Sequence, residues 1–510
     1  MSKPSSRPGR EEIKTQRKER KRIERELRKR QEIEGLTPPK QVCISNGKSE
    51  YRTVEEEREA RTDAAINQAR ILQSRLPVIL KRLAKIADPR NPRKIKHKLT
   101  VLMVYGILTF VYQMASRREA NSEMTRPMFV ENLMLLFPGL ESIPHHDTLM
   151  RLLCRIDVNQ IESANLDLVK NLIRKKKFKR YLVDQYYPVA IDGTQKLVRD
   201  TLWSEECLER KVKEGEGTAK QYYVYVLEAN LVFSNGMNIP LMSEFLSYTD
   251  GDISRNKQDC ELEAFKRLAK RLKAEFPCLR IMVLADGLYP NGPVMNDICR
   301  KYGWQFMIVL QDKSLPSVWE EYDGLKGLQP DNKLKMNWGN RRQQFQWVNN
   351  IYYYYGPNGR KKLTLHLVTC EESWEELDKH SNEVITKTSR HAWISSEPLD
   401  KGNIHKRCNL GARHRWGIES SILVEKRQGY QYEHCFSYDW HVMKGYHYLM
   451  RLGHALNVLA QYAECLGGFI KNMGVRGFIH FIKGTLSAPW FSDPQRVKDR
   501  IAVPFQLRLI

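Results

Sequence analysis

Hydrophobic residues recur at helical spacing over residues 64–157. The segments AAINQARILQSRLPVILKRLAKI, MFVENLMLLFPGL and HDTLMRLLCRI place apolar residues three or four positions apart, which is typical of amphipathic helices. The run over residues 99–115 is apolar almost throughout, but it is shorter than the ~20 residues that a membrane-spanning helix needs. We therefore expect it to be a buried helix within a helical region that covers residues 64–182.

The end of this region has two interpretations. The sequence SIPHHD before TLMRLL is a possible helix cap, so the last two helices are compatible with a helix-turn-helix motif that binds DNA. A generic helical bundle explains the same pattern. The basic cluster RKKKFKR follows and leads into a strand.

A different pattern begins at residue 183. The apolar segments YYPVAIDG and LRIMVLADG predict two strands that end at Asp192 and Asp286. Between them, YYVYVLEANLVFSNG and NIPLMSEFLSY are joined by a Ser-Asn-Gly turn and predict an antiparallel hairpin, and CELEAFKRLAKRLKAEF predicts a helix. A second helix and the strand QFMIVLQD complete an α/β fold with a mixed sheet over residues 183–314.

After residue 314 the predicted structure changes from strands to helices. Short β runs with turn residues over residues 315–395 predict a β-rich insertion. Residues 396–466 return to helices, with RHRWGIESSILVEKRQGY followed by HVMKGYHYLMRLGHALNVLAQYAECL, which reads as a long amphipathic helix. Residues 467–510 predict a helical tail.

Charge narrows the choice of partner. The formal net charge is +24 and the pI is about 9.5, so the surface attracts phosphate-rich polymers, and nucleic acid is the favoured partner. An anionic membrane surface would use the same charge, but the N-terminus has no apolar signal-peptide core. Residues 1–63 predict a basic arm, either disordered or a single solvated helix, which serves for phosphate contacts or as a solubilising tail.

The ten cysteines form no C-x-x-C pair and indicate a reducing compartment, the cytoplasm, rather than a disulfide framework. Five residues near the glutamate helix are possible metal ligands, but their spacing fits no zinc pattern. We expect structural or nucleic-acid-facing roles for these residues, which are His405, Cys408, His414, His434 and Cys435.

Three carboxylates stand out as candidate chemistry. Asp192 and Asp286 follow apolar strands, and functional groups of open α/β sheets gather beyond the carboxyl ends of strands. With Glu419 they would form an oxygen-rich site suited to Mg²⁺ or Mn²⁺, which supports in-line phosphoryl transfer by two metal ions about 4 Å apart. For either aspartate alone, an ordinary Asp-Gly turn after a strand is the favoured interpretation. The competing acids are Asp184, Asp200, Asp250 and Asp252.

Glu419 also belongs to a charged pattern. If residues 413–430 are helical, Arg415, Glu419 and Lys426 lie at i, i+4 and i+11, on one side of the helix. One interpretation is an ordinary solvated salt-bridge face. The other is a catalytic glutamate between two cations that neutralise the phosphates of a bound strand.

These residues resemble the bacterial insertion-sequence transposases of the DDE class over roughly residues 76–460. The similarity rests on VAIDGT, KQDCELEAFKRL, VLADGLYPNGPV and the Arg415, Glu419 and Lys426 positions of a Tyr-Arg-Glu-Lys signature, whose Tyr position is Ala412 here. The resemblance implies an RNase H-like catalytic domain with a β-rich insertion and the metal-binding catalytic triad Asp192, Asp286 and Glu419.

The resemblance also implies an activity and its partners. Such proteins cut at terminal inverted repeats and join the released 3′-hydroxyl to target DNA, as a dimer in a synaptic complex. Arg415 and Lys426 would contact double-stranded DNA. Trp338 and Trp347 are candidates to hold a flipped base, although core packing or surface stacking is the favoured role for each.

Two other functions stay open. A catalytically silent, site-specific DNA-binding protein would keep the fold without turnover. A metal-dependent nuclease, or a Holliday-junction enzyme, would use the same carboxylates with water as its only nucleophile. The residues themselves predict phosphodiester chemistry, and strand transfer comes from the resemblance.

Overall fold

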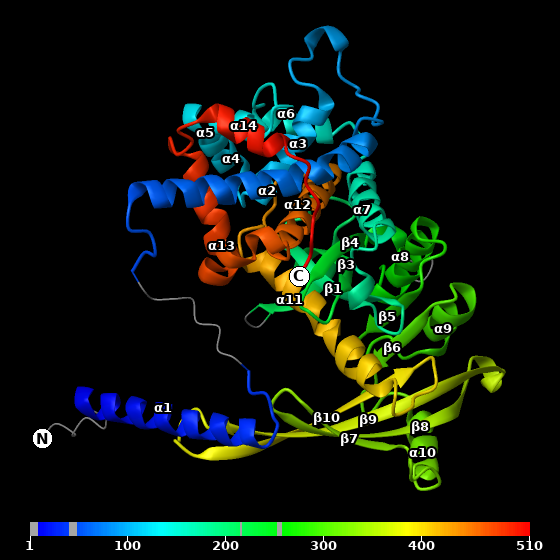
Figure 1. Cartoon of the computed structure of the whole chain (residues 1–510). Coiled ribbons are helices and arrows are strands. Elements are labelled where there is room, and N and C mark those ends of the chain that lie inside the picture. Colours follow the sequence, from blue (N-terminus) through cyan, green and yellow to red (C-terminus); the bar gives the residue numbers. More distant parts are fainter. Residues whose placement is uncertain (1–8, 40–47, 215–216, 252–257) are drawn as a thin grey trace, which may run out of the picture. The chain divides into compact units, whose positions relative to one another are not determined.

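The computed structural model describes residues 9–39, 48–214, 217–251 and 258–510. The chain divides into two compact units. The larger unit comprises Ile44–Ala285 and Asn409–Ile510, and the smaller unit comprises Met1–Cys43 and Asp286–Cys408. Helices and strands are labelled in Figure 1. No helix in the described parts of the chain is long and apolar enough to cross a bilayer.

A mixed sheet forms the centre of the larger unit. Its strands are listed in chain order: β1 (Tyr187–Arg199), β2 (Leu208–Glu214), β3 (Gly217–Val232), β4 (Asn238–Phe245) and β5 (Ile281–Ala285). β3 pairs antiparallel with β1, β2 and β4, whereas β5 pairs parallel with β1. The spatial order β4-β3-β1-β5 and these directions confirm the predicted hairpin and the RNase H-like mixed sheet.

Helices lie on this sheet. α8 (Glu261–Glu275) packs against β3 and β4, as the CELEAFKRL pattern predicts, and α11 (Trp416–Arg427) packs against β1 and β3. α8 and α11 are both amphipathic, and each turns apolar residues such as Phe265 and Ile418 inward. The sheet can therefore bury its apolar surface.

The helical region before the sheet starts earlier than residue 64. α2 (Val54–Leu83) begins at the N-cap Thr53, whose side chain accepts a hydrogen bond from Glu56 N, while the Glu56 carboxylate accepts one from Arg52 N, just before the cap, at 2.6 Å. This cap stabilises a first turn whose surface is too polar for a hydrophobic pattern to reveal. The other helices are α3 (Leu99–Val111), α4 (Arg117–Met124), α5 (Pro127–Leu136), α6 (His146–Leu153) and α7 (Asn159–Arg174).

Two helices form the core of the larger unit. α3 is buried along nearly its whole length, which confirms the prediction for the apolar run. α12 (Trp440–Gln461) is buried on all sides over its last five turns, so the prediction of an amphipathic helix there is wrong. α3, α7, α2, α6 and β4 surround it, and its polar residues find buried partners. α13 (Gly467–Leu486) and α14 (Pro494–Ala502) form the tail.

The smaller unit contains the β-rich segment. Its strands are β6 (Gln305–Val309), β7 (Lys333–Trp338), β8 (Arg341–Tyr355), β9 (Lys361–Leu377) and β10 (Val384–Ser395). They are antiparallel in the order β6-β10-β9-β8-β7. The unit's helices are α1 (Arg10–Ile33), α9 (Gly292–Asn296) and α10 (Pro316–Leu325).

The close approach of α12 to α3 depends on Gly453. A Cβ at this position would lie 2.8 Å from Phe110 Cβ and 3.3 Å from the carbonyl oxygen of Ile107. We expect Gly453→Ala to lower the free energy of unfolding by about 1–3 kcal/mol, because the two helices must separate. Gly468→Ala in α13, where a Cβ meets open space, is the control, and denaturant unfolding measures both. An unchanged free energy of unfolding in Gly453→Ala would contradict this close packing.

Candidate active site

Asp192 lies within β1 and not at its end. β1 continues to Arg199 because β3 stays paired with it through Tyr222, so the predicted strand terminus at Asp192 is wrong. The half-buried Asp192 is opposite Glu228 in this antiparallel ladder, and directly opposed residues point to the same face. Parallel pairing of β1 with β5 ends at Ala190, two residues before Asp192. At Asp192, β1 is therefore still paired with β3 on one edge but no longer with β5 on the other edge.

Asp286 directly follows the last residue of β5, as predicted. Its Oδ1 accepts a hydrogen bond from Leu288 N at 2.9 Å, which is the local turn that an aspartate at this position favours. The β1–β5 register pairs Ala190 with Leu284, and Asp286 comes two residues after Leu284. Asp192 and Asp286 therefore each come two residues after the last paired residues of the β1–β5 ladder, Ala190 and Leu284.

Glu419 stands in the first turn of α11, and its side chain is 39% exposed. Arg415 Nη2 is 2.8 Å from Glu419 Oε1, so the i, i+4 pair expected from the sequence forms. The Arg415 side chain is only 6% exposed, and its Nε and Nη1 have no hydrogen-bond partner in the described parts of the chain. Buried donors without a partner are costly, so an anion that reached these two atoms would satisfy them.

Lys426 anchors the other end of α11. Its Nζ donates to the carbonyl oxygen of Gln195 in β1 at 2.9 Å and lies 3.0 Å from Glu433 Oε1. Gln195 follows Asp192 by three residues in the same strand. The lysine therefore ties the helix that carries Glu419 to the strand that carries Asp192.

The two tryptophans chosen from the sequence differ in accessibility. Trp347 in β8 is 2% exposed, and its ring belongs to the core of the smaller unit. Trp338 ends β7 opposite Arg341 and is half-buried. Sequence reasoning overlooked Trp416, which is 61% exposed and has the Arg415 guanidinium 4.9 Å from its ring centre.

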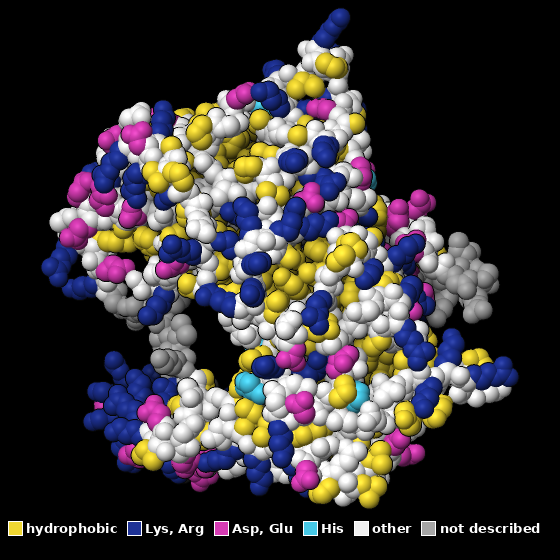
Figure 2. Space-filling model, turned by 45° about the vertical axis from the view of Figure 1, so that its right-hand side comes forward, with side chains coloured by type: hydrophobic (Ala, Val, Ile, Leu, Met, Phe, Trp, Pro, Cys, Tyr) yellow, Lys and Arg dark blue, Asp and Glu magenta, His cyan; other side chains and the backbone are white. Residues whose placement is uncertain are grey.

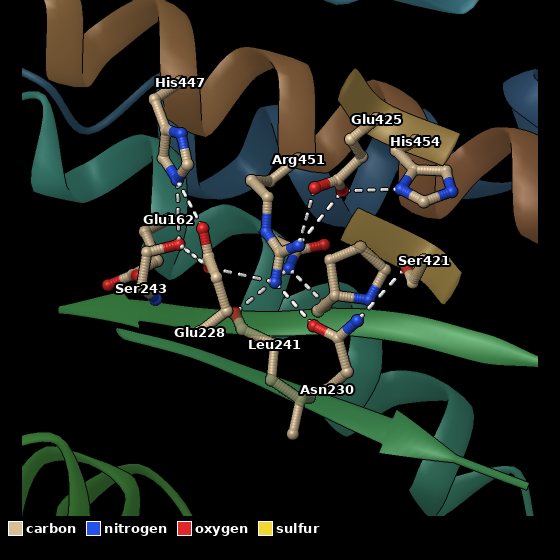
Figure 3. Close-up of polar contacts among 12 residues, drawn as sticks. Glu162, Glu228, Asn230, Leu241, Ser243, Ser421, Glu425, His447, Arg451 and His454 are labelled. Carbon is tan, nitrogen blue, oxygen red and sulfur yellow. Dashed lines mark hydrogen bonds and ion pairs between the residues drawn. The ribbon is translucent and has the colours of Figure 1, made fainter. Parts of the chain in front are cut away.

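A buried ion network, which the sequence did not reveal, fixes α11 on the sheet (Figure 3). Arg451 of α12 lies between two carboxylates: its Nη1 is 3.0 Å from Glu425 Oε1 of α11, and its Nη2 is 3.1 Å from Glu228 Oε2 of β3. All three side chains are essentially inaccessible to solvent. We call these three residues the Arg451 clamp.

Further hydrogen bonds complete the clamp. Glu228 accepts from the Tyr432 hydroxyl at 2.8 Å and from the Ser243 hydroxyl at 2.6 Å, and His454 Nδ1 lies 2.6 Å from Glu425 Oε1. Asn230 accepts from Arg451 and donates to Ser421 of α11 at 3.2 Å. Asn230 and Glu228 are two residues apart in β3, so α11 lies on the face of the sheet toward which Asp192 points.

The clamp carboxylates are ionised. Burial alone would raise the pKa of Glu228, but the charge of Arg451 and the contacts with His447 and Ser243 outweigh burial and lower it to about 2. Burial lowers the pKa of His447 to about 4, so its ring is neutral at pH 7. In β1, burial lowers the pKa of Lys196 to about 8, while its Nζ donates to the Tyr432 carbonyl oxygen at 2.6 Å.

The described residues contain no group of three or more His, Cys, Asp or Glu side chains placed to hold a metal ion. The chemistry of the three predicted ligands nevertheless fits a hard divalent cation, because each is a carboxylate. Of the competing acids, Asp184 is half-buried, Asp200 and Asp250 are exposed, and Asp252 lies outside the described residues.

Comparisons with known proteins bear on the helical region. Residues 80–169 match the family model DDE_Tnp_1-associated, which confirms at a coarse level the expected link to DDE transposases. No curated protein sequence matches the chain. Among solved structures, the piggyBac transposase synaptic complex with hairpin DNA is similar over 86% of this chain and 84% of that chain, with 11% identity and a TM-score of 0.32. At this TM-score the likeness indicates nothing about activity.

Replacing the clamp arginine tests its structural role. We expect Arg451→Met to lower the free energy of unfolding by about 3–5 kcal/mol, because two buried carboxylates lose their shared cation. Arg496→Met, which removes an exposed partner of Glu59, is the matched control and should cost less than about 1 kcal/mol. Similar losses for the two variants in urea unfolding would show that the clamp does not hold the fold.

The low pKa of Glu228 predicts a pH dependence. A carboxylate whose pKa is about 2 in the folded protein and near 4.5 when unfolded stabilises the fold above pH 4.5, and this contribution disappears as the pH falls toward 2. We expect Glu228→Gln to cost on the order of 3 kcal/mol at pH 6 and progressively less toward pH 3. Urea unfolding across this range measures the difference, and a pH-independent difference would refute the assignment.

Proposed function

We propose that this protein is a DNA transposase in which Asp192, Asp286 and Glu419 are the catalytic carboxylates. One observation carries the proposal: Lys426 joins the helix that bears Glu419 to the strand that bears Asp192, and the Arg451 clamp holds the same helix to the neighbouring strand β3 on one face of the sheet. The position of Asp286 after β5, in parallel register with β1, adds the third acid. The family match of the helical region supports the same kind of protein.

In this proposal the three carboxylates hold Mg²⁺, for which Mn²⁺ can substitute. The bound metal would supply charge that stabilises the attacking and leaving oxygens of an in-line phosphodiester displacement. Glu419 would share its carboxylate between the metal and Arg415. The two remaining guanidinium nitrogens of Arg415, Nε and Nη1, would bind a phosphate. Arg415 thus both orients the glutamate and meets the substrate.

The substrate of the proposed reaction is double-stranded DNA. The net charge of +24 supports a polyanionic partner, and Arg415 is the contact that the geometry favours most. Lys426 would reach a phosphate only by exchanging its bond to Gln195 or its pairing with Glu433. Of the tryptophans, Trp338 is the more accessible candidate for a flipped base, because the ring of Trp347 would first have to leave the core.

The full proposed cycle is cleavage at terminal inverted repeats followed by joining of the 3′-hydroxyl ends to target DNA. Two copies of the chain would hold the paired ends in a synaptic complex. An origin in a bacterial insertion sequence and membership of the Tyr-Arg-Glu-Lys subgroup belong to the same proposal, with Ala412 replacing the signature tyrosine.

Cleavage of a labelled duplex that carries the element's terminal repeat tests the proposal. We expect the wild type to cut with Mg²⁺ or Mn²⁺ and not with EDTA. Asp192→Asn, Asp286→Asn and Glu419→Gln should each bind the duplex and cut it roughly 10³-fold more slowly or worse, because each removes one metal ligand. Asp200→Asn, which neutralises an exposed acid near the end of β1, is the matched control and should cut normally.

The alternatives predict other results in the same assay. Binding of the terminal repeat without metal-dependent cutting by the wild type would indicate a silent DNA-binding protein. Metal-dependent cutting without joined products would indicate a nuclease. Normal cutting by any of the three carboxylate variants would remove that residue from the catalytic set.

A further inference from the structure

One face of α1 is fixed by the smaller unit. Leu27 and Gln31 are buried, and Gln31 Nε2 donates to the carbonyl oxygen of Glu375 in β9 at 3.1 Å. Arg20 Nη1 donates to the carbonyl oxygen of Asp378 at 2.8 Å, so contacts continue for three turns of the helix. Figure 1 shows α1 running beside the strands of this unit. Because these contacts fix the rotation of α1 about its axis, its opposite face has a defined composition.

That opposite face is basic. Positions at i, i+4, i+7, i+11 and i+15 share one side of a helix, and here they are occupied by Lys14, Lys18, Lys21, Arg25 and Lys29. We call these five exposed residues the basic face of α1. Figure 2 shows Lys and Arg side chains gathered over α1. The carboxylates in line with the basic face, Glu11 and Glu32, stand only at its two ends.

Four of the five charges of the basic face are not neutralised by any residue that the structure describes. Lys14 is 3.8 Å from Glu11, whereas Lys18, Lys21, Arg25 and Lys29 form no ion pair or hydrogen bond with any residue that the structure describes. Some other cations of the same helix are paired, such as Arg22 with Glu19 and Glu26, and Arg30 with Glu375. Four of the five cations of the basic face therefore have no carboxylate partner in the described parts of the chain, as also holds for Arg17 and Arg28 beside it.

We infer that the basic face of α1 is a binding surface for the phosphate backbone of duplex DNA, independent of base sequence. From Lys14 to Lys29 the face extends about 22 Å, and duplex DNA carries roughly a dozen phosphates over that length. Adjacent like charges on a helix repel each other, and phosphate contact removes this repulsion. The inference rests on the proposed function only in taking DNA as the substrate, and it adds a contact surface outside the carboxylate site.

The salt dependence of DNA binding tests the inference. The test variant is Lys18→Gln, Lys21→Gln, Arg25→Gln and Lys29→Gln together, since glutamine keeps a similar helix propensity. The probe is a duplex of unrelated sequence in EDTA, with the full-length protein. Each phosphate contact contributes about 0.9 to the slope of log K against log salt. We expect the variant to lose about three to four from the magnitude of this slope, and tenfold or more in affinity near 0.15 M salt.

A charge-matched control separates local contact from net charge. Lys98→Gln, Lys266→Gln, Lys326→Gln and Arg496→Gln together also remove four positive charges, each from an exposed ion pair. This control should keep the wild-type slope to within about one contact. Circular dichroism of both variants establishes that the helices remain folded.

Three results would overturn the inference. The first is an unchanged slope in the α1 variant, and the second is an equal loss in the control, which would make net charge the only cause. The third is a loss of binding to vesicles that contain phosphatidylserine with DNA binding intact, which would identify a membrane surface as the partner. Failure of the proposed function would look different, because a wild type that never cuts DNA can still show this salt dependence.

Discussion

The position of the glutamate helix depends on one buried cation shared between two carboxylates. Glu228, Glu425 and Arg451 come from β3, α11 and α12, so three elements meet at a single guanidinium group. Moving charges out of water is costly, and the cost is offset only if every charged atom finds a partner. Tyr432, Ser243, Asn230 and His454 supply those partners. An arrangement that is this fully bonded tolerates little displacement of any one element.

The geometry of the candidate site follows from this constraint. Glu425 and Lys426 are neighbours in α11 that bind different elements, the first to α12 and the second to β1. Two anchors on different sides of one helix fix both its rotation and its distance from the sheet. Glu419 lies on the same side as Lys426, two turns earlier in the helix, where this rotation leaves it partly exposed beside Arg415. Accessibility at Glu419 and burial at Glu425 are thus two results of one orientation.

Local patterns in the sequence predicted the elements but not their long-range partners. The β3–β4 hairpin, α8 and the short strand β5 were predictable because each carries its own periodicity and turn residues. The end of β1 was not, because Asp192-Gly193 reads as a turn while pairing with β3 continues the strand. The pattern of α12 predicts an amphipathic helix because its Arg and His residues count as polar, whereas Arg451 and His454 are buried against Glu425.

In the candidate site, too, local spacing was predictable from the sequence and long-range partners were not. Arg415 and Glu419 were recognisable from their i, i+4 spacing, and their ion pair forms. Glu228 lies in the apolar strand sequence VLEANL, where nothing nearby indicates that it meets an arginine. The metal-binding roles of the three acids stay a prediction from their residue types and from the resemblance.

The order of the clamp residues along the chain has a consequence for synthesis on the ribosome. Asn230 and Arg451 are separated by 221 residues, a stretch that takes on the order of 10–40 s to translate at 5–20 residues per second. During this interval Glu228 and Asn230 have no guanidinium to bind, and burying them would be unfavourable. The nascent sheet therefore has to keep this face hydrated, and chaperones can reach it, until α12 has left the exit tunnel.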